Sequence, residues 1–270
     1  MGHQVSAIEL IGKFRNMRGF KRPGTKGILV SAPGGGSKSH FNTSPSMART
    51  RENASEQGAV FASSANVILY LITNVLKRVA GKSRNLLTKI LRKLQETDTT
   101  NTRGHRSILF SDASGVLSRL MTGINISKRN LNSVLRYVWH HSYAGGSGAY
   151  SIIFTNGLLP TDFFVVPKGA NYFRLILSVC EAGDVTYDAT TNKFEKAQAT
   201  VGNSSDTGWV AIAAGLPAPT TLSVVTTHPF PASTGMIGSL QLQFAQTVGV
   251  GDYALIGDES DVVVSAGIPV

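Results

Sequence analysis

The segment SPSMARTRENASEQG, residues 44–58, marks the point where the chain changes from short extended stretches to helix. Ser44 can cap a helix and Pro45 suits a first helical turn. Apolar or small side chains then recur at steps of three, four and seven residues, which predicts one long helix of roughly 35 residues that ends at Gly81. A second amphipathic pattern predicts another helix over residues 83–96.

The residues before this segment predict a basic N-terminal arm. Residues 11–32 place apolar side chains on both sides of a Pro-Gly turn, which predicts a β-hairpin, and residues 33–44 predict a Gly/Ser loop. A phosphate-binding loop around Lys38 would need glycine where Ala32 and Ser37 stand. A nucleotide site is therefore not expected there.

The residues after the helices predict an antiparallel β-domain, because short runs rich in Val, Ile, Phe and Thr alternate with turn sequences such as GNSSD at 202–206. Residues 108–140 have a mixed pattern, with a helix near 127–138. The fold class is therefore α+β: an N-terminal β-hairpin and long helices (1–44 as the arm, 45–140 as the basic helical region) precede a C-terminal antiparallel β-sandwich or barrel (141–270). The expected strands lie at 150–154, 163–167, 172–180, 185–188, 208–213, 220–227, 236–246, 252–256 and 261–266.

Positive charge is concentrated in the first part of the chain, whose overall net charge is +10. Residues 1–107 hold 18 Lys and Arg against 5 Asp and Glu, a net charge of +13, while residues 108–270 hold 8 against 11, a net charge of −3. This asymmetry predicts a polyanion partner for the basic half. A basic surface that only aids solubility, or that meets acidic patches on neighbouring subunits, is the alternative that the sequence leaves open.

The strongest indication of a binding surface is a set of basic side chains that runs from the end of the first expected helix through the second helix to the segment after it. On a pair of helices they would form a positive strip that contacts phosphates of RNA or DNA without reading the base sequence. The alternative is a solvated helix face. The candidate nucleic-acid-binding residues are Lys77, Arg78, Lys82, Arg84, Lys89, Arg92, Lys93, Arg103 and Arg106.

The helix start carries a second cluster of polar residues, to which a structural role is assigned. Glu52 and Glu56 lie one helical turn apart, as do Arg49 and Asn53, so the cluster can form ion pairs within the helix. It can also clamp the hairpin or a neighbouring subunit. The structural motif comprises Pro45, Arg49, Thr50, Arg51, Glu52, Asn53 and Glu56.

This motif resembles one found in a family of uncharacterised proteins from Bacteroidota, in which a basic hairpin precedes a Pro-x-x-x-x-Thr-Arg-x-Asn-x-x-Glu-x-Gly helix start. Pro45, Thr50, Arg51, Asn53, Glu56 and Gly58 match it, whereas Met47 and Gln57 stand where the family has aromatic residues. The stretches VVPKGANYFRLILSV and TYDATTNKFE also resemble the C-terminal part of that family. The resemblance implies a C-terminal β-domain and brings no activity with it.

The residue pattern does not predict catalysis, a cofactor, a metal site or a small-molecule substrate. Cys180 is the only cysteine, so neither an internal disulfide nor a thiolate metal site can form. The six histidines lack metal-ligand spacing, and no Gly-x-Ser-x-Gly motif occurs. Residues 57–76 are uncharged, but polar side chains interrupt the stretch, so a buried or interface helix is expected rather than a membrane span.

The sequence therefore favours a non-enzymatic, self-assembling structural protein, coat-like or filament-forming, whose partners are identical subunits and RNA or DNA. The alternative is a binding module whose β-domain recognises a glycan or a protein, with the helices as its anchor to an assembly or a membrane. Aromatic side chains gathered on one rim of the β-domain would favour the alternative. Residues 1–10 lack the apolar region of a signal peptide, so a cytoplasmic assembly or particle is expected.

Overall fold

The chain divides into two compact units, Met1–Arg51 and Glu52–Val270. The computed structural model combines helices with antiparallel sheets, so the α+β class is confirmed. The residues that it describes are 2–4, 12–14, 17–20, 28–31, 37–72, 81–111, 115–121, 124–125, 131–135, 140–144, 147–156, 164–226, 232–255 and 261–265.

The first unit contains a small antiparallel sheet with the strand order β1-β4-β3-β2. The predicted hairpin is present, since β2 pairs with β3 and β3 pairs with β4. Ile28 and Leu29 of β4 are buried. The strands are β1 (Gly2–Gln4), β2 (Gly12–Phe14), β3 (Met17–Phe20) and β4 (Ile28–Ser31).

The predicted Gly/Ser loop is wrong at its end, where a short helix α1 (Lys38–Thr43) forms. The Ser37 hydroxyl accepts the His40 N–H at 3.1 Å, and this N-cap offsets the poor helix propensity of the segment. Ser44 then precedes a 3-10 turn, η1 (Pro45–Met47), with Pro45 at its first position as expected.

The described part of the predicted long helix forms α2, which spans Ala48–Ile72, and the expected continuation over residues 73–80 lies outside the described residues. Gly81 does not end it but is the first residue of α3 (Gly81–Glu96). The prediction was wrong at this point because glycine is favourable at both ends of a helix, so its presence alone does not tell a stop from a start.

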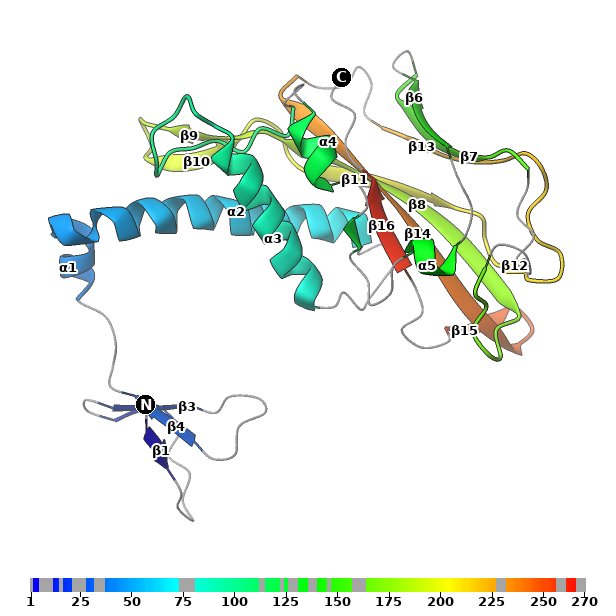
Figure 1. The fold of residues 1–270 in the computed structure, drawn as a ribbon, viewed down its shortest axis with the longest axis horizontal. Coiled ribbons are helices and arrows are strands. Elements are labelled where there is room, and N and C mark those ends of the chain that lie inside the picture. The colour runs from blue at the N-terminus through cyan, green and yellow to red at the C-terminus, as the bar shows by residue number, and fades with distance from the viewer. Residues whose placement is uncertain are drawn as a thin grey trace. The chain divides into compact units, whose positions relative to one another are not determined.

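Helices α2 and α3 pack on one another and on the sheet of the second unit (Figure 1). Their apolar side chains, among them Val60, Val67, Leu91 and Leu94, share a core with residues of the long strands such as Ile237. The Ser64 and Thr88 hydroxyls form a buried hydrogen bond of 3.1 Å between the helices. The helix expected near 127–138 is reduced, within the described residues, to α5 (Leu131–Val134), and α4 (Val116–Met121) precedes it.

The described part of the second unit contains three antiparallel sheets. The largest has seven strands in the order β11-β8-β14-β16-β5, with β12 also pairing with β8 and β15 with β14; the others are β13-β7-β6 and β10-β9. The strands are β5 (Ile124–Asn125), β6 (His140–Ala144), β7 (Ala149–Phe154), β8 (Tyr172–Gly183), β9 (Val185–Asp188), β10 (Lys193–Lys196), β11 (Val201–Asp206), β12 (Val210–Ala211), β13 (Thr220–Val225), β14 (Thr234–Gly249), β15 (Asp252–Leu255) and β16 (Asp261–Ser265).

Most expected strands are present, but two assignments were wrong. GNSSD at 202–206 lies in β11, where six residues pair with β8, so cross-strand pairing overrides the turn preference of Gly, Asn and Ser. In the expected strand 163–167, the described part forms only an isolated bridge at Phe164. Strands β5, β6 and β10 were not predicted from the sequence.

Strand β8 separates the two cores of the second unit. Phe173, Leu175, Leu177 and Val179 point to one side, where they pack with residues of β7, β13 and β14. Cys180 and Ala182 contribute instead to the core shared with the helices. Within the described residues, no helix is both long enough and apolar enough to cross a membrane.

Candidate functional site

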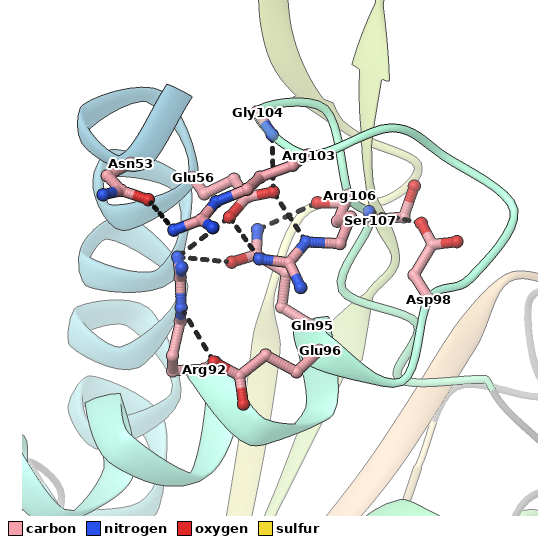
Figure 2. Close-up of polar contacts among 10 residues, drawn as sticks. All are labelled: Asn53, Glu56, Arg92, Gln95, Glu96, Asp98, Arg103, Gly104, Arg106 and Ser107. Atoms are coloured by element: carbon pink, nitrogen blue, oxygen red, sulfur yellow. Dashed lines mark hydrogen bonds and ion pairs between the residues drawn. The ribbon is translucent and has the colours of Figure 1, made fainter. Parts of the chain in front are cut away.

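The polar motif of α2 centres on Glu56, whose side chain is fully buried. Arg106 binds it with two hydrogen bonds, from Nε to Oε1 at 2.8 Å and from Nη2 to Oε2 at 2.7 Å. Arg92 Nη1 lies 3.1 Å from Oε2, and the Gly104 N–H donates to Oε1 at 2.8 Å (Figure 2). We refer to Asn53, Glu56, Arg92, Arg103, Gly104 and Arg106 as the Glu56 cluster.

The cluster joins three parts of the chain. Asn53 and Glu56 come from α2, Arg92 from α3, and the other members from the loop that follows α3. Arg103 Nη2 donates to Asn53 Oδ1 at 2.7 Å, beside the Glu56 contacts (Figure 2). The cluster therefore fixes the position of α2 relative to α3 and the loop.

Asp98 gives the loop the shape that presents these groups. Its carboxylate accepts hydrogen bonds from the backbone N–H groups of Thr100, Asn101 and Ser107, at 2.9, 3.1 and 2.7 Å. At Gly104 the backbone has a φ of +98°, and a Cβ there would lie 3.0 Å from Glu52 Cγ. Glycine is thus required at this position for both its conformation and its close contact with α2.

A second layer of contacts orients the two arginines. Gln95 Nε2 donates to the carbonyl oxygen of Arg106 at 2.8 Å, and Gln95 Oε1 accepts from Arg92 Nη1 at 3.2 Å. Arg92 Nε also lies 3.4 Å from Glu96 Oε1. The Arg92 guanidinium is therefore held by Glu56, Gln95 and Glu96, whereas Gln95 holds Arg106 through its backbone and leaves the Arg106 guanidinium directed at Glu56.

The electrostatics of the cluster favour the ionised form of Glu56. Burial raises the pKa of Glu56, but the hydrogen bonds from Arg106 and Gly104 and the charges of Arg106 and Arg92 outweigh it and lower the pKa to about 2. The pKa of Arg106 is raised, chiefly by its hydrogen bond to Glu56. A carboxylate held this way is a poor general acid or base near neutral pH.

This depressed pKa predicts a specific loss of stability in acid. Glu56 stabilises the fold above the ordinary carboxyl pKa of 4.5, and its contribution disappears as the pH falls towards about 2. The free energy of unfolding of the native chain should therefore decline between these pH values more steeply than that of Glu56→Gln. Urea denaturation of both proteins at several pH values measures the difference, and parallel curves would contradict the prediction.

The structure changes the interpretation of the polar motif. Glu56 does not pair within its own helix but with arginines 36 and 50 residues further along the chain, so the expectation of intrahelical pairing was wrong for this residue. Arg51 Nη1 donates to the carbonyl oxygens of Phe41 and Ser44 at 2.7 and 3.0 Å, within the first unit. Arg49 and Thr50 are exposed, and Glu52 is half-buried against Gly104.

The candidate nucleic-acid-binding residues do not all lie on one free surface. Arg92 and Arg106 are held on Glu56, and Arg103 is exposed but donates to Asn53. Lys89 and Lys93 are exposed on α3, one turn apart. Lys77 and Arg78 lie outside the described residues, and α3 includes Lys82 and Arg84, whose side chains are not described. Counting charges along the sequence could not separate the arginines bound to Glu56 from the exposed lysines, because Glu56 lies on another helix, α2.

The sequence also missed a group of aromatic side chains at one end of the large sheet, comprising Tyr172, Trp209 and Tyr253. Tyr172 lies in β8, Tyr253 in β15, and Trp209 in the loop between β11 and β12, so no local spacing could have indicated that they meet. Among the described residues, no group of three or more His, Cys, Asp or Glu side chains is placed to hold a metal ion.

Comparisons with protein-family models, with curated proteins and with solved structures gave no match. The resemblance to the Bacteroidota family therefore stays a prediction from the sequence. The function has to be inferred from the geometry of this chain.

Proposed function

We propose that this protein is a non-enzymatic structural protein that assembles with identical copies through its N-terminal unit. The observation that carries the proposal is the small size of the sheet in that unit. Its strands have three or four residues each and lie within residues 2–31. Chain segments shorter than about 40 residues rarely bury enough apolar surface to be stable without a disulfide, a metal or a partner.

A second copy of the chain is the simplest source of the apolar contacts that the first unit lacks. Cys180 lies in the second unit, so a disulfide within the first unit is excluded by the sequence. Exchange of such an arm between identical chains produces closed or open symmetric assemblies, depending on the rotation that relates neighbouring copies. We propose that the arm contributes this contact and that the second unit forms the body of each subunit.

In the body, we propose that the seven-stranded sheet and the β13-β7-β6 sheet form a β-sandwich. Residues of both, such as Leu175 of β8, Ile152 of β7 and Leu222 of β13, share one apolar core, which supports this arrangement. The Glu56 cluster joins the helices α2 and α3 on this body. Its polar residues thus serve the architecture of the subunit rather than a reaction.

We further propose that the exposed face of α3 contacts phosphates when the assembly packages nucleic acid. Lys89 and Lys93 are exposed there, one helical turn apart. Two lysines give a weak contact in one subunit, but the contact repeats in every copy of an assembly. This part of the proposal depends on self-assembly and is tested in the same experiment.

The test is the native mass of the full chain by size-exclusion chromatography with light scattering, with absorbance at 260 and 280 nm before and after nuclease. We expect a particle of many subunits. High absorbance at 260 nm that survives nuclease would support packaging, whereas a protein-only spectrum would retain assembly and contradict the nucleic-acid part. A monomer at all concentrations would contradict the proposal.

Leu29→Asp tests the role of the arm in the full chain, because it places a charge at a buried position of β4. We expect it to reduce the native mass to that of a monomer while the thermal transition of the second unit is retained. Lys38→Glu is the matched control, since it changes an exposed residue of the same unit and should leave the mass unchanged. A full-size particle from Leu29→Asp would exclude the arm as the assembly contact.

A further inference from the structure

At one end of the large sheet, β12 pairs with β8 and β15 pairs with β14 (Figure 1). Three aromatic rings meet at this end. Trp209 stacks on Tyr253 with ring centroids 5.2 Å apart and an interplanar angle of 22°. Tyr172 meets Tyr253 edge to face at 4.9 Å. All three side chains are half-buried, so the group presents aromatic surface to solvent instead of filling a core.

A guanidinium and a carboxylate lie beside these rings. The Arg174 guanidinium carbon is 4.7 Å from the centre of the Trp209 ring. Gln243 of the neighbouring strand holds the guanidinium, accepting from Arg174 Nη2 at 2.7 Å and Nε at 3.2 Å. Asp206 is oriented by the Gly208 N–H, which donates to its Oδ1 at 2.6 Å.

The charged pair is close but not hydrogen-bonded. Arg174 Nη1 lies 3.8 Å from Asp206 Oδ2, beyond hydrogen-bond distance, and the two side chains are 27% and 40% exposed. A hydroxyl group can bridge this gap from the side, because it donates one hydrogen bond and accepts others. It would donate to Asp206 Oδ2 and accept from Arg174 Nη1.

We propose that Tyr172, Arg174, Asp206, Trp209 and Tyr253 form a binding site for a neutral saccharide. The hydroxyl groups of a sugar ring match the gap between Arg174 and Asp206, and the apolar C–H face of the ring packs on the adjacent aromatic surface. Polar groups of this kind fix the orientation of a ligand, while the rings supply contact area.

The charges at the site favour a neutral sugar over other ligands. One carboxylate beside one guanidinium leaves no net charge to attract a phosphate or an acidic sugar. A purely apolar partner would take Asp206 and Arg174 out of water without replacing their hydrogen bonds, which is unfavourable. The proposal goes beyond self-assembly and does not depend on it, and it gives the β-domain the glycan recognition that the sequence left as an alternative.

Trp209 itself can report binding. The chain has two tryptophans, so Trp139→Phe leaves Trp209 as the only one in the full-length protein. Cellohexaose, chitohexaose and maltohexaose are titrated separately to about 10 mM while the emission of Trp209 is recorded. We expect a saturable change with at least one of them, because the sugar would exclude water from the indole.

Conservative variants then locate the site. Asp206→Asn keeps the shape but weakens the acceptor, and Arg174→Lys keeps the charge but loses the planar fork; each should weaken binding about tenfold. Tyr187→Leu is the matched control, because Tyr187 is a half-buried tyrosine of a separate cluster with His105 and Phe194. The affinity of the Tyr187→Leu variant for the sugar should not change.

Two results would overturn the proposal. One is the absence of any saturable emission change with all three sugars. The other is binding that Asp206→Asn and Arg174→Lys leave intact, which would place the sugar elsewhere. Circular dichroism of each variant separates loss of binding from loss of folding, and the native mass of each reports self-assembly independently.

Discussion

Glu56→Gln is expected to lower the free energy of unfolding by about 3–5 kcal/mol, because it removes the charge from a buried carboxylate, leaves Arg106 without its counter-charge and leaves Arg92 with only the exposed Glu96. The amide keeps the size of the side chain but offers one acceptor instead of two. In a unit of this size the melting temperature should fall by about 6–20 °C. Thermal and urea denaturation of the full chain measure the effect.

Glu96→Gln is the matched control for this substitution. Glu96 also contacts Arg92, but its side chain is 52% exposed and one helical turn away on the same helix. Exposed pairs of this kind contribute less than about 1 kcal/mol. Equal effects of the two substitutions would mean that Glu56 is not the centre of the cluster.

Gly235→Ala should destabilise the second unit by about 3 kcal/mol. Gly235 lies in β14, where a Cβ would come within 2.1 Å of the carbonyl oxygen and 2.6 Å of the carbonyl carbon of Phe110. These are backbone atoms of a segment that also pairs with β9 through Ile108 and Val185, so they cannot move aside without breaking other contacts. The added methyl group therefore forces the segment off the sheet.

The same change at Gly58 provides the control. Gly58 lies on an exposed position of α2, and a Cβ there would have no atom within 4 Å. Alanine is the better helix former, so Gly58→Ala should stabilise the protein by about 1 kcal/mol. Opposite signs for the two substitutions are expected in urea denaturation. A neutral result at Gly235 would contradict the close approach of Phe110.

Much of the secondary structure could be predicted from the sequence, because it depends on neighbours in the chain. The apolar periodicity of α2 and α3 and the β-rich runs of the second unit are local patterns. The failures have two different causes. Strand β11 was missed because its pairing partner β8 supplies the strand preference that its own residues lack. The assignment of Gly81 as a helix end was wrong because glycine is favourable at both ends of a helix, and Gly81 is the first residue of α3.

The sequence alone determined the fold class, the basic N-terminal half and the presence of a polar motif at the start of α2. Only the tertiary structure decided what that motif does, since Glu56 meets Arg92 and Arg106 across long separations in the chain. The tertiary structure likewise brought together Arg174 of β8, Tyr253 of β15 and Trp209 of the loop before β12. The physical reason is the separation along the chain over which each effect acts. Helix and strand propensities act between near neighbours, whereas burial and charge pairing depend on which distant segments the fold places in contact.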